Sequence, residues 1–123
     1  MQITSHLHTA ILVSDLAKSE HFYSNILGLQ KVNRTLKFPG IWYQIGEFQL
    51  HLIVDPNWRP NLMNQEKLGR NPHLAFAVKD LKMIKKHLEE NNCVTQMSAS
   101  GRAALFTQDP DGNIIELTVP TGS

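Results

Sequence analysis

Two stretches of this chain follow one pattern, H-x-A-x-x-V-x-D-L: His8-Thr-Ala-Ile-Leu-Val-Ser-Asp-Leu16 and His73-Leu-Ala-Phe-Ala-Val-Lys-Asp-Leu81. They begin 65 residues apart, and the same offset leads from His51 to Glu116. Self-similarity at a fixed offset is the signature of a repeated structural unit. The sequence therefore predicts two copies of one module, each with a pair of potential metal ligands.

Length and composition fit one compact domain. The chain has 123 residues, of which 41% are hydrophobic and 19% charged, with 12 basic and 11 acidic side chains. That balance argues against disorder and supplies no basic stripe for nucleic acid. The lone Cys93 excludes an intramolecular disulfide, and no apolar run approaches the roughly 20 residues of a membrane span. We expect a soluble, cytoplasmic protein that binds neither nucleic acid nor membranes.

Each module is expected to fold as βαβββ. The first, about residues 5–55, has a helix from Ser14-Asp15 to Gly28 and strand candidates at 7–13, 29–35, 41–45 and 48–54. The second, about residues 73–120, has a helix from Asp80 to Asn91-Asn92 and strand candidates at 73–78, 94–98, 103–107 and 114–119. The fold class is therefore α+β.

Strand parity places the four potential ligands on equivalent faces. Side chains alternate along a strand, so His8 lies opposite the apolar face formed by Thr9, Ile11 and Val13. His51, His73 and Glu116 follow the same rule in their own strands. All four should project from the face that the helices leave uncovered, as in a cupped mixed sheet with helices outside. Three imidazoles and a carboxylate suit one divalent Zn, Ni, Co, Fe or Mn ion.

The segment between the modules, about residues 56–72, contains three prolines. It is either a plain linker or a lid, and Trp58, Arg59 and Arg70 favour a lid or a loop that contacts an anion. Arg102 lies at the start of a strand, where it either holds a carboxylate or phosphate or stays on the surface. Trp58, Arg70 and Arg102 are the candidate substrate-binding residues.

The motifs resemble those of a known family. His8–Val13 with Ser19-x-x-Phe22-Tyr23-x-x-x-Leu27-Gly28 resembles the N-terminal signature of glyoxalase I, and Pro72–Asp80 looks like its second signature. Asp109-Pro-Asp-Gly-Asn-Ile-Ile-Glu116 is similar to the closing motif of the glyoxalase/bleomycin resistance/dioxygenase group, the vicinal oxygen chelate superfamily. The resemblance covers residues 1–123 as a single domain.

The resemblance implies a function class and a set of roles. It implies that the four metal ligands are His8, His51, His73 and Glu116. It also implies a homodimer, because ligands in this family often come from both chains. The leading activity is metal-dependent proton transfer on a small molecule by an isomerase or lyase, with Glu116 as the catalytic base.

Two alternatives stay open: an Fe(II) or Mn(II) extradiol-type dioxygenase, and a drug-sequestering protein of the bleomycin-resistance type. His51 stands where glyoxalase I has glutamate, and Leu12 where bacterial glyoxalases have an arginine for glutathione, so glutathione is disfavoured. Phe106 stands where extradiol dioxygenases have tyrosine, which disfavours ring cleavage.

Overall fold

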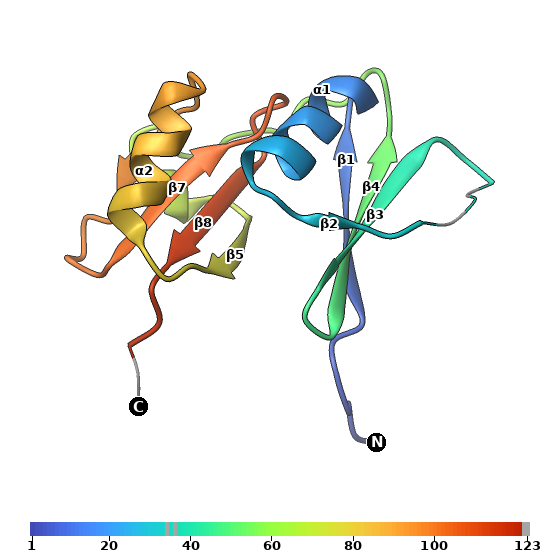
Figure 1. Ribbon diagram of the computed structural model, residues 1–123, viewed down its shortest axis with the longest axis horizontal. Helices are drawn as coiled ribbons and strands as arrows, with labels where there is room; N and C mark the ends of the chain where they lie inside the picture. Colours follow the sequence, from blue (N-terminus) through green and yellow to red (C-terminus); the bar gives the residue numbers. More distant parts are fainter. Residues whose placement is uncertain (34, 36, 122–123) are drawn as a thin grey trace. The chain divides into compact units, whose positions relative to one another are not determined.

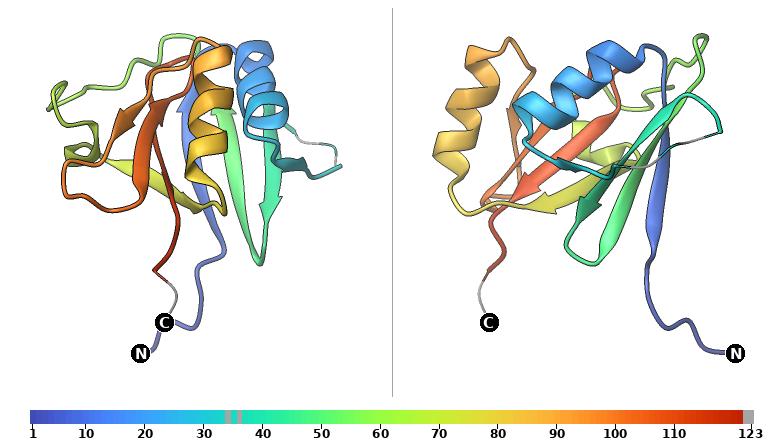
Figure 2. Two further views of the ribbon diagram at one scale, coloured as in Figure 1. Left: turned by 60° about the vertical axis from the view of Figure 1, so that its left-hand side comes forward. Right: turned by 45° about the vertical axis from the view of Figure 1, so that its right-hand side comes forward.

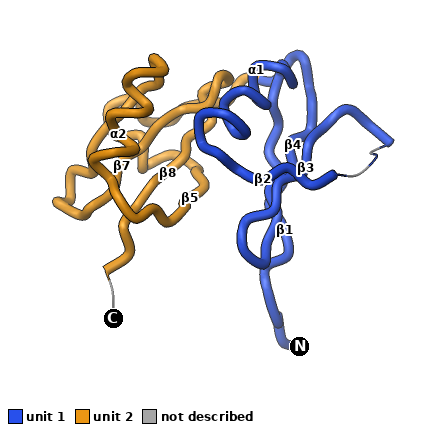
Figure 3. The backbone as a smooth tube through the Cα atoms, viewed as in Figure 1, with its two compact units in different colours: residues 1–58 blue, residues 59–123 orange. Residues whose placement is uncertain are grey.

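The computed structural model describes residues 1–33, 35 and 37–121. The chain divides into two compact units, Met1–Trp58 and Arg59–Ser123 (Figure 3). Each unit contains a four-stranded mixed sheet and follows the predicted βαβββ order, so the predicted α+β class is confirmed. Among the described residues, no helix is long and apolar enough to cross a membrane.

The described residues of unit 1 form six elements. They are β1 (His8–Val13), α1 (Leu16–Glu20), the π-helix η1 (His21–Ile26), β2 (Gln30–Lys31), β3 (Gly40–Ile45) and β4 (Phe48–Val54). The strand order is β1-β4-β3-β2, with β1 parallel to β4 and the other pairs antiparallel (Figure 1). The central strand β4 therefore holds His51 between β1 and β3.

The helix of unit 1 begins and ends near the predicted positions but changes its winding. Asp15 is the N-cap, and its carboxylate accepts a hydrogen bond from the amide of Lys18. The amide of Leu27 donates to the carbonyl of Phe22, five residues back, so the second half is a π-helix. Gly28 follows with φ of 73°, the left-handed conformation that helix ends favour. The predicted helix is thus present between Asp15 and Gly28, but its second half is wound as a π-helix.

Unit 2 also contains six elements. They are the 3-10 helix η2 (Leu68–Arg70), β5 (His73–Ala77), α2 (Leu81–Glu90), β6 (Gln96–Met97), β7 (Ala104–Gln108) and β8 (Ile114–Thr118). The strand order β5-β8-β7-β6 repeats that of unit 1, with β5 parallel to β8. Asp80 caps α2 by accepting from the amide of Met83, as its position predicted. Helix α2 runs along one face of this sheet (Figure 2).

Two predicted strands are shorter in the structure. β2 covers two residues of the predicted 29–35 strand, in which residue 34 lies outside the described residues. β6 covers two residues of the predicted 94–98 strand. Both strands lie at an edge of their sheet.

The helix of each unit packs on the sheet face opposite the candidate ligands. In unit 1 Tyr23 of η1 contacts Tyr43, whose hydroxyl is 2.8 Å from Ser24 Oγ. Tyr43 pairs with Leu50, and alternation then places His51 on the other face. In unit 2 the face that carries Glu116 also carries Phe106 and Ile114, and Leu68 of η2 packs against these two side chains. Part of the segment predicted as a linker is thus a core-forming piece of unit 2.

Candidate metal and substrate site

His8 and His51 of unit 1 form a ring stack. β1 and β4 pair with Ala10 opposite His51, so His8 lies two residues upstream of the paired position. The two imidazole centroids are 4.2 Å apart and the ring planes differ by 14°. Trp42, directly across from His51 on β3, stacks with a centroid distance of 3.8 Å and an angle of 4°. Because β1 and β3 flank β4, His51 is held between two rings, and it is only 7% exposed.

A chain of two glutamines sets the tautomer of His51. Gln44 Nε2 donates to the carbonyls of Gly46 and Phe48, at 2.8 and 3.3 Å, which fixes its amide orientation because carbonyls only accept. Gln44 Oε1 then accepts from Gln49 Nε2 at 2.8 Å, and Gln49 Oε1 lies 2.8 Å from His51 Nε2. His51 Nε2 therefore carries a hydrogen, and in the neutral ring the lone pair is on Nδ1. A histidine that binds a metal through one ring nitrogen typically donates the hydrogen of the other ring nitrogen in such a hydrogen bond.

His73 and Glu116 of unit 2 form a polar pair in the same register. Ala75 is opposite Glu116, so His73 is again two residues upstream. His73 Nδ1 is 2.7 Å from the carbonyl oxygen of Asn71, and His73 Nε2 is 3.2 Å from Glu116 Oε1. The carbonyl only accepts, so Nδ1 carries a hydrogen and Nε2 of the neutral ring turns a lone pair toward the carboxylate. Two such acceptors repel each other unless a proton or a metal ion lies between them.

The separation of these two atoms fits a shared metal ion. Bonds of about 2.1 Å from one ion to a nitrogen and an oxygen, at an angle of roughly 100°, place the two donors about 3.2 Å apart. The His73 and Glu116 donor atoms are 3.2 Å apart. The observed pair thus has both the chemistry and the spacing of neighbouring ligands.

Arg102 and Phe106 complete the surroundings of Glu116. The Glu116 side chain is 9% exposed, and Arg102 Nη1 approaches its Oε2 to 3.5 Å. Phe106 is directly across from Glu116 on β7 and meets the His73 ring edge-on, with centroids 5.5 Å apart and planes at 87°. The Glu116 carboxylate is therefore bordered by His73 and Arg102 and by the apolar ring of Phe106.

The two pairs belong to different units, His8 with His51 in unit 1 and His73 with Glu116 in unit 2. Within residues 1–33, 35 and 37–121, no group of three or more His, Cys, Asp or Glu side chains is arranged to hold a metal ion. The four-ligand site therefore stays a prediction that requires both pairs to meet on one ion.

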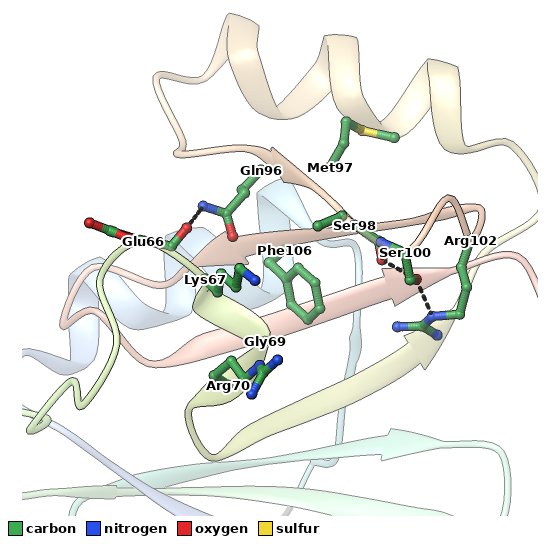
Figure 4. Close-up of a pocket in the computed structure, with 11 residues that line it drawn as sticks. Glu66, Lys67, Gly69, Arg70, Gln96, Met97, Ser98, Ser100, Arg102 and Phe106 are labelled. Atoms are coloured by element: carbon green, nitrogen blue, oxygen red, sulfur yellow. Dashed lines mark hydrogen bonds between the residues drawn. The ribbon is translucent and has the colours of Figure 1, made fainter.

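Two of the three predicted substrate residues line one cavity in unit 2. Arg70 and Arg102 lie on opposite sides of Phe106 in a cavity of about 650 Å³ (Figure 4). Trp58 is the last residue of unit 1, and its amide donates to the carbonyl of Asp55 in a turn after β4. Trp58 is not among the residues that line this cavity.

Comparison with known proteins identifies the family. Residues 6–117 match the model of the glyoxalase/bleomycin resistance protein/dioxygenase superfamily. The chain belongs to this superfamily. Members of the glyoxalase superfamily generally use a divalent metal.

Relatives within the glyoxalase superfamily are distant. The protein YaeR of Escherichia coli (strain K12) is 32% identical over 89% of this chain and 92% of its own length. A lactoylglutathione lyase of Salmonella typhimurium is 26% identical over 90% of this chain and 89% of its own. The crystal structure of the fosfomycin resistance protein FosX of Listeria monocytogenes shares the fold, with a TM-score of 0.77, 16% identity, and coverage of 98% of this chain and 94% of that one.

The sequence analysis did not identify three neighbours of the candidate ligands. Trp42 could have been found, because a two-residue turn at Gly46-Glu47 places it opposite His51. Gln49 and Asn71 could not, because their hydrogen bonds to His51 and His73 depend on side-chain and loop conformation.

Proposed function

We propose that this chain is a divalent-metal-dependent isomerase or lyase, glyoxalase I-like in type, that moves a proton on a small molecule with two neighbouring oxygens. The supporting observation is the contact between His73 and Glu116. An imidazole whose Nδ1–H is bound to the Asn71 carbonyl turns its Nε2 lone pair to a carboxylate 3.2 Å away. Such a pair is suited to hold a cation and also contains a base.

The proposed ligands are His8, His51, His73 and Glu116. A divalent ion bound there would act as a Lewis acid that stabilises negative charge developing on the two substrate oxygens. Of these four residues, only Glu116 is anionic in its unprotonated form.

Glu116 is the proposed base. Its two oxygens have different neighbours, with His73 near Oε1 and Arg102 Nη1 near Oε2. When Oε1 is not bound to the ion, it can accept a proton from the carbon that bears one of the two substrate oxygens, while Arg102 keeps the carboxylate oriented through Oε2. Returning that proton to the adjacent carbon, which bears the other oxygen, and moving a hydroxyl proton from the first oxygen to the second would complete an isomerisation. In the proposed site the Nε2 lone pair of His73 would hold the ion, so His73 would not be available as the base.

The test replaces Glu116 by glutamine, which has the same shape and one oxygen but no basicity. Solvent deuterium incorporation is measured with a panel of 2-oxoaldehyde hemithioacetals and of 2-oxo and acyl-thioester compounds. We expect a loss of about 10²–10⁴-fold for Glu116→Gln in metal-loaded protein, the usual cost of removing a general base. Glu89→Gln, on the surface of α2 in the same unit, is the matched control and should exchange at the parent rate.

Metal content is measured on each preparation by elemental analysis. Nickel, cobalt or zinc in the purified protein favours isomerisation, whereas iron favours the oxygenase chemistry that the sequence left open. A metal-loaded Glu116→Gln variant that exchanges the proton as fast as the parent would show that the base lies elsewhere.

A further inference from the structure

The cavity in unit 2 concentrates positive charge. Three of its lining side chains are cationic, Lys67, Arg70 and Arg102, and one is acidic, Glu66. Lys67 and Arg70 come from η2 and its flank, and Arg102 from the loop before β7. Among the described residues, the side chains of Lys67 and Arg70 have no carboxylate within ion-pair distance. Lys67 and Arg70 are therefore not neutralised by these ion pairs, whereas Arg102 approaches the Glu116 carboxylate to 3.5 Å.

Neutral hydrogen-bonding groups lie beside these cations. Ser98 Oγ and Ser100 Oγ are 2.8 Å apart, and Arg102 Nε donates to Ser100 Oγ at 3.2 Å. The hydrogen bond to Ser100 orients the guanidinium of Arg102, whose side chain is 55% exposed. Hydroxyls and a guanidinium together are the groups that proteins use to bind oxyanions.

The loop that carries Lys67 and Arg70 is anchored from two sides. Gln96 of β6 donates to the carbonyl of Glu66 at 2.8 Å and accepts from the amide of Leu68 at 2.9 Å. Gly69 packs directly on the ring of Phe106, where an added Cβ would lie 2.4 Å from Cζ. The cationic wall and the aromatic floor of the cavity are thus preformed.

The cavity also adjoins the proposed base. Arg102 lines the cavity and approaches Glu116 Oε2 to 3.5 Å, and Phe106 lines it and contacts the His73 ring. A ligand in the cavity therefore lies next to the side chains that contact the His73–Glu116 pair.

We propose that this cavity binds the anionic group of the substrate, a carboxylate or phosphoryl oxyanion, between Arg70 and Arg102, with an adjacent apolar or aromatic part on Phe106. The claim that this anion belongs to the substrate rests on the proposed function, whereas anion binding by the cavity does not. Phe106 and the two arginines would then select small anionic compounds and hold their reactive carbon beside Glu116.

The test uses three probes that share one ring: phenylphosphonate, benzoate and the neutral benzamide. They are titrated into metal-free protein, so that no anion binds through a metal, and backbone amide NMR shifts are followed. We expect both anions, and not benzamide, to shift the amides of residues 67–70 and 98–102. The anion that binds with the higher affinity shows whether the cavity prefers a phosphoryl or a carboxylate oxyanion.

Variants locate the binding. Arg70→Gln and Arg102→Gln should each weaken the tighter anion by about 10- to 100-fold, the usual loss for a hydrogen bond to a charged group. Lys86→Gln removes the same charge from the exposed side of α2, where the side chain is 80% exposed, and should leave affinity unchanged. The amide spectrum of each variant reports whether it is folded, and Arg70→Gln leaves the contact between Arg102 and Glu116 in place.

Equal binding of benzamide, equal losses in Lys86→Gln and Arg70→Gln, or shifts confined to other residues would overturn the proposal. If no anion binds while Glu116→Gln still abolishes proton exchange, the proposed function stands and the substrate class is wrong. If anions bind but Glu116→Gln exchanges normally, the cavity assignment stands and the proton-transfer function fails.

Discussion

The two units share one register but hold their candidate ligands by different forces. In both, the histidine of the first strand lies two residues upstream of the position opposite the second ligand, and an aromatic residue faces that ligand across the hairpin. In unit 1 that aromatic residue is Trp42, and three rings stack. In unit 2 it is Phe106, and the ligand is a carboxylate in contact with His73 and Arg102.

The difference separates the features that the repeated backbone determines from those that the side chains determine. Backbone pairing decides which positions face one another, and it is the same in both sheets. The residues at those positions decide whether the pair is neutral and stacked or charged and hydrogen-bonded. Under the proposed function, unit 1 would provide two imidazole donors, and unit 2 would provide the anionic ligand that also acts as the base.

The largest expected effect is the loss of metal when either unit loses its histidine. His8→Ala removes a donor from unit 1 and His73→Ala removes one from unit 2, and each should abolish stoichiometric binding because the site has only four protein ligands. Elemental analysis after dialysis measures this. Unchanged metal content in the double variant would contradict the site.

Mixing the two single variants separates a site within one chain from a site shared by two. If ligands come from both chains of a dimer, a mixed dimer contains one site with both intact histidines and regains metal. If each site lies within one chain, every site in the mixture keeps one defect and no metal is regained. Light scattering on the same samples reports whether the predicted homodimer exists.

The second-largest expected effect is a loss of stability, and it should be equal in the two units. Leu52 and Leu117 follow His51 and Glu116 directly, are 0% and 3% exposed, and lie on the face opposite the ligands. Replacing either by alanine should lower the free energy of unfolding by about 2–5 kcal/mol, because a buried cavity is left behind. Denaturant unfolding measures the loss, and the dependence of the unfolding free energy on denaturant concentration should stay unchanged. A cost below about 1 kcal/mol at one position alone would mean that the two cores are not equivalent.

Local patterns predicted the scaffold well. β4 was predicted at 48–54 and is observed there, and Asp80 and Gly28 mark helix boundaries as expected. These features depend on alternation, capping and backbone conformation, which neighbouring residues determine. The π-helical winding of His21–Ile26 was not predicted, because the spacing of apolar residues does not distinguish it from an α-helix.

The repeat offset itself fails at one place in the site. Adding 65 to Trp42 leads to Thr107, yet the residue across from Glu116 is Phe106. The turn between β3 and β4 has two residues, whereas the turn between β7 and β8 runs from Asp109 to Asn113, and this longer turn shifts the pairing by one residue. The cavity could not be predicted from the sequence either, because one of its walls is held by a hydrogen bond from Gln96 to a residue about 30 positions away.

A smaller effect is expected from the aromatic neighbours. Trp42→Leu removes the ring stacked at 3.8 Å on His51, and Phe106→Leu removes an edge contact at 5.5 Å to His73. A stacked aromatic pair contributes about 0.5–1.5 kcal/mol, so Trp42→Leu should weaken metal affinity by roughly 2- to 13-fold. Phe106→Leu should weaken it less. Competition with a chelator measures both, and equal losses would show that stacking does not distinguish the units.

The smallest effect concerns the edge strands, which are secured differently in the two units. Gln96 ties β6 to backbone groups of unit 2, whereas Lys31 ties β2 to Glu20 through an ion pair of 2.8 Å between side chains that are 52% and 42% exposed. Exposed pairs of this kind contribute about 0–1 kcal/mol, so Lys31→Met should change the free energy of unfolding by no more than that, and less in high salt.

The hydrogen bond and negative charge of Glu20 raise the pKa of Lys31 above its ordinary 10.5. A raised lysine pKa means that the pair's contribution is fully present at neutral pH and is lost only as the pH rises through that higher value. Denaturant unfolding of parent and Lys31→Met between pH 6 and about 9 should therefore give a constant small difference. A difference that grows over this range would show that β2 is held by something other than this ion pair.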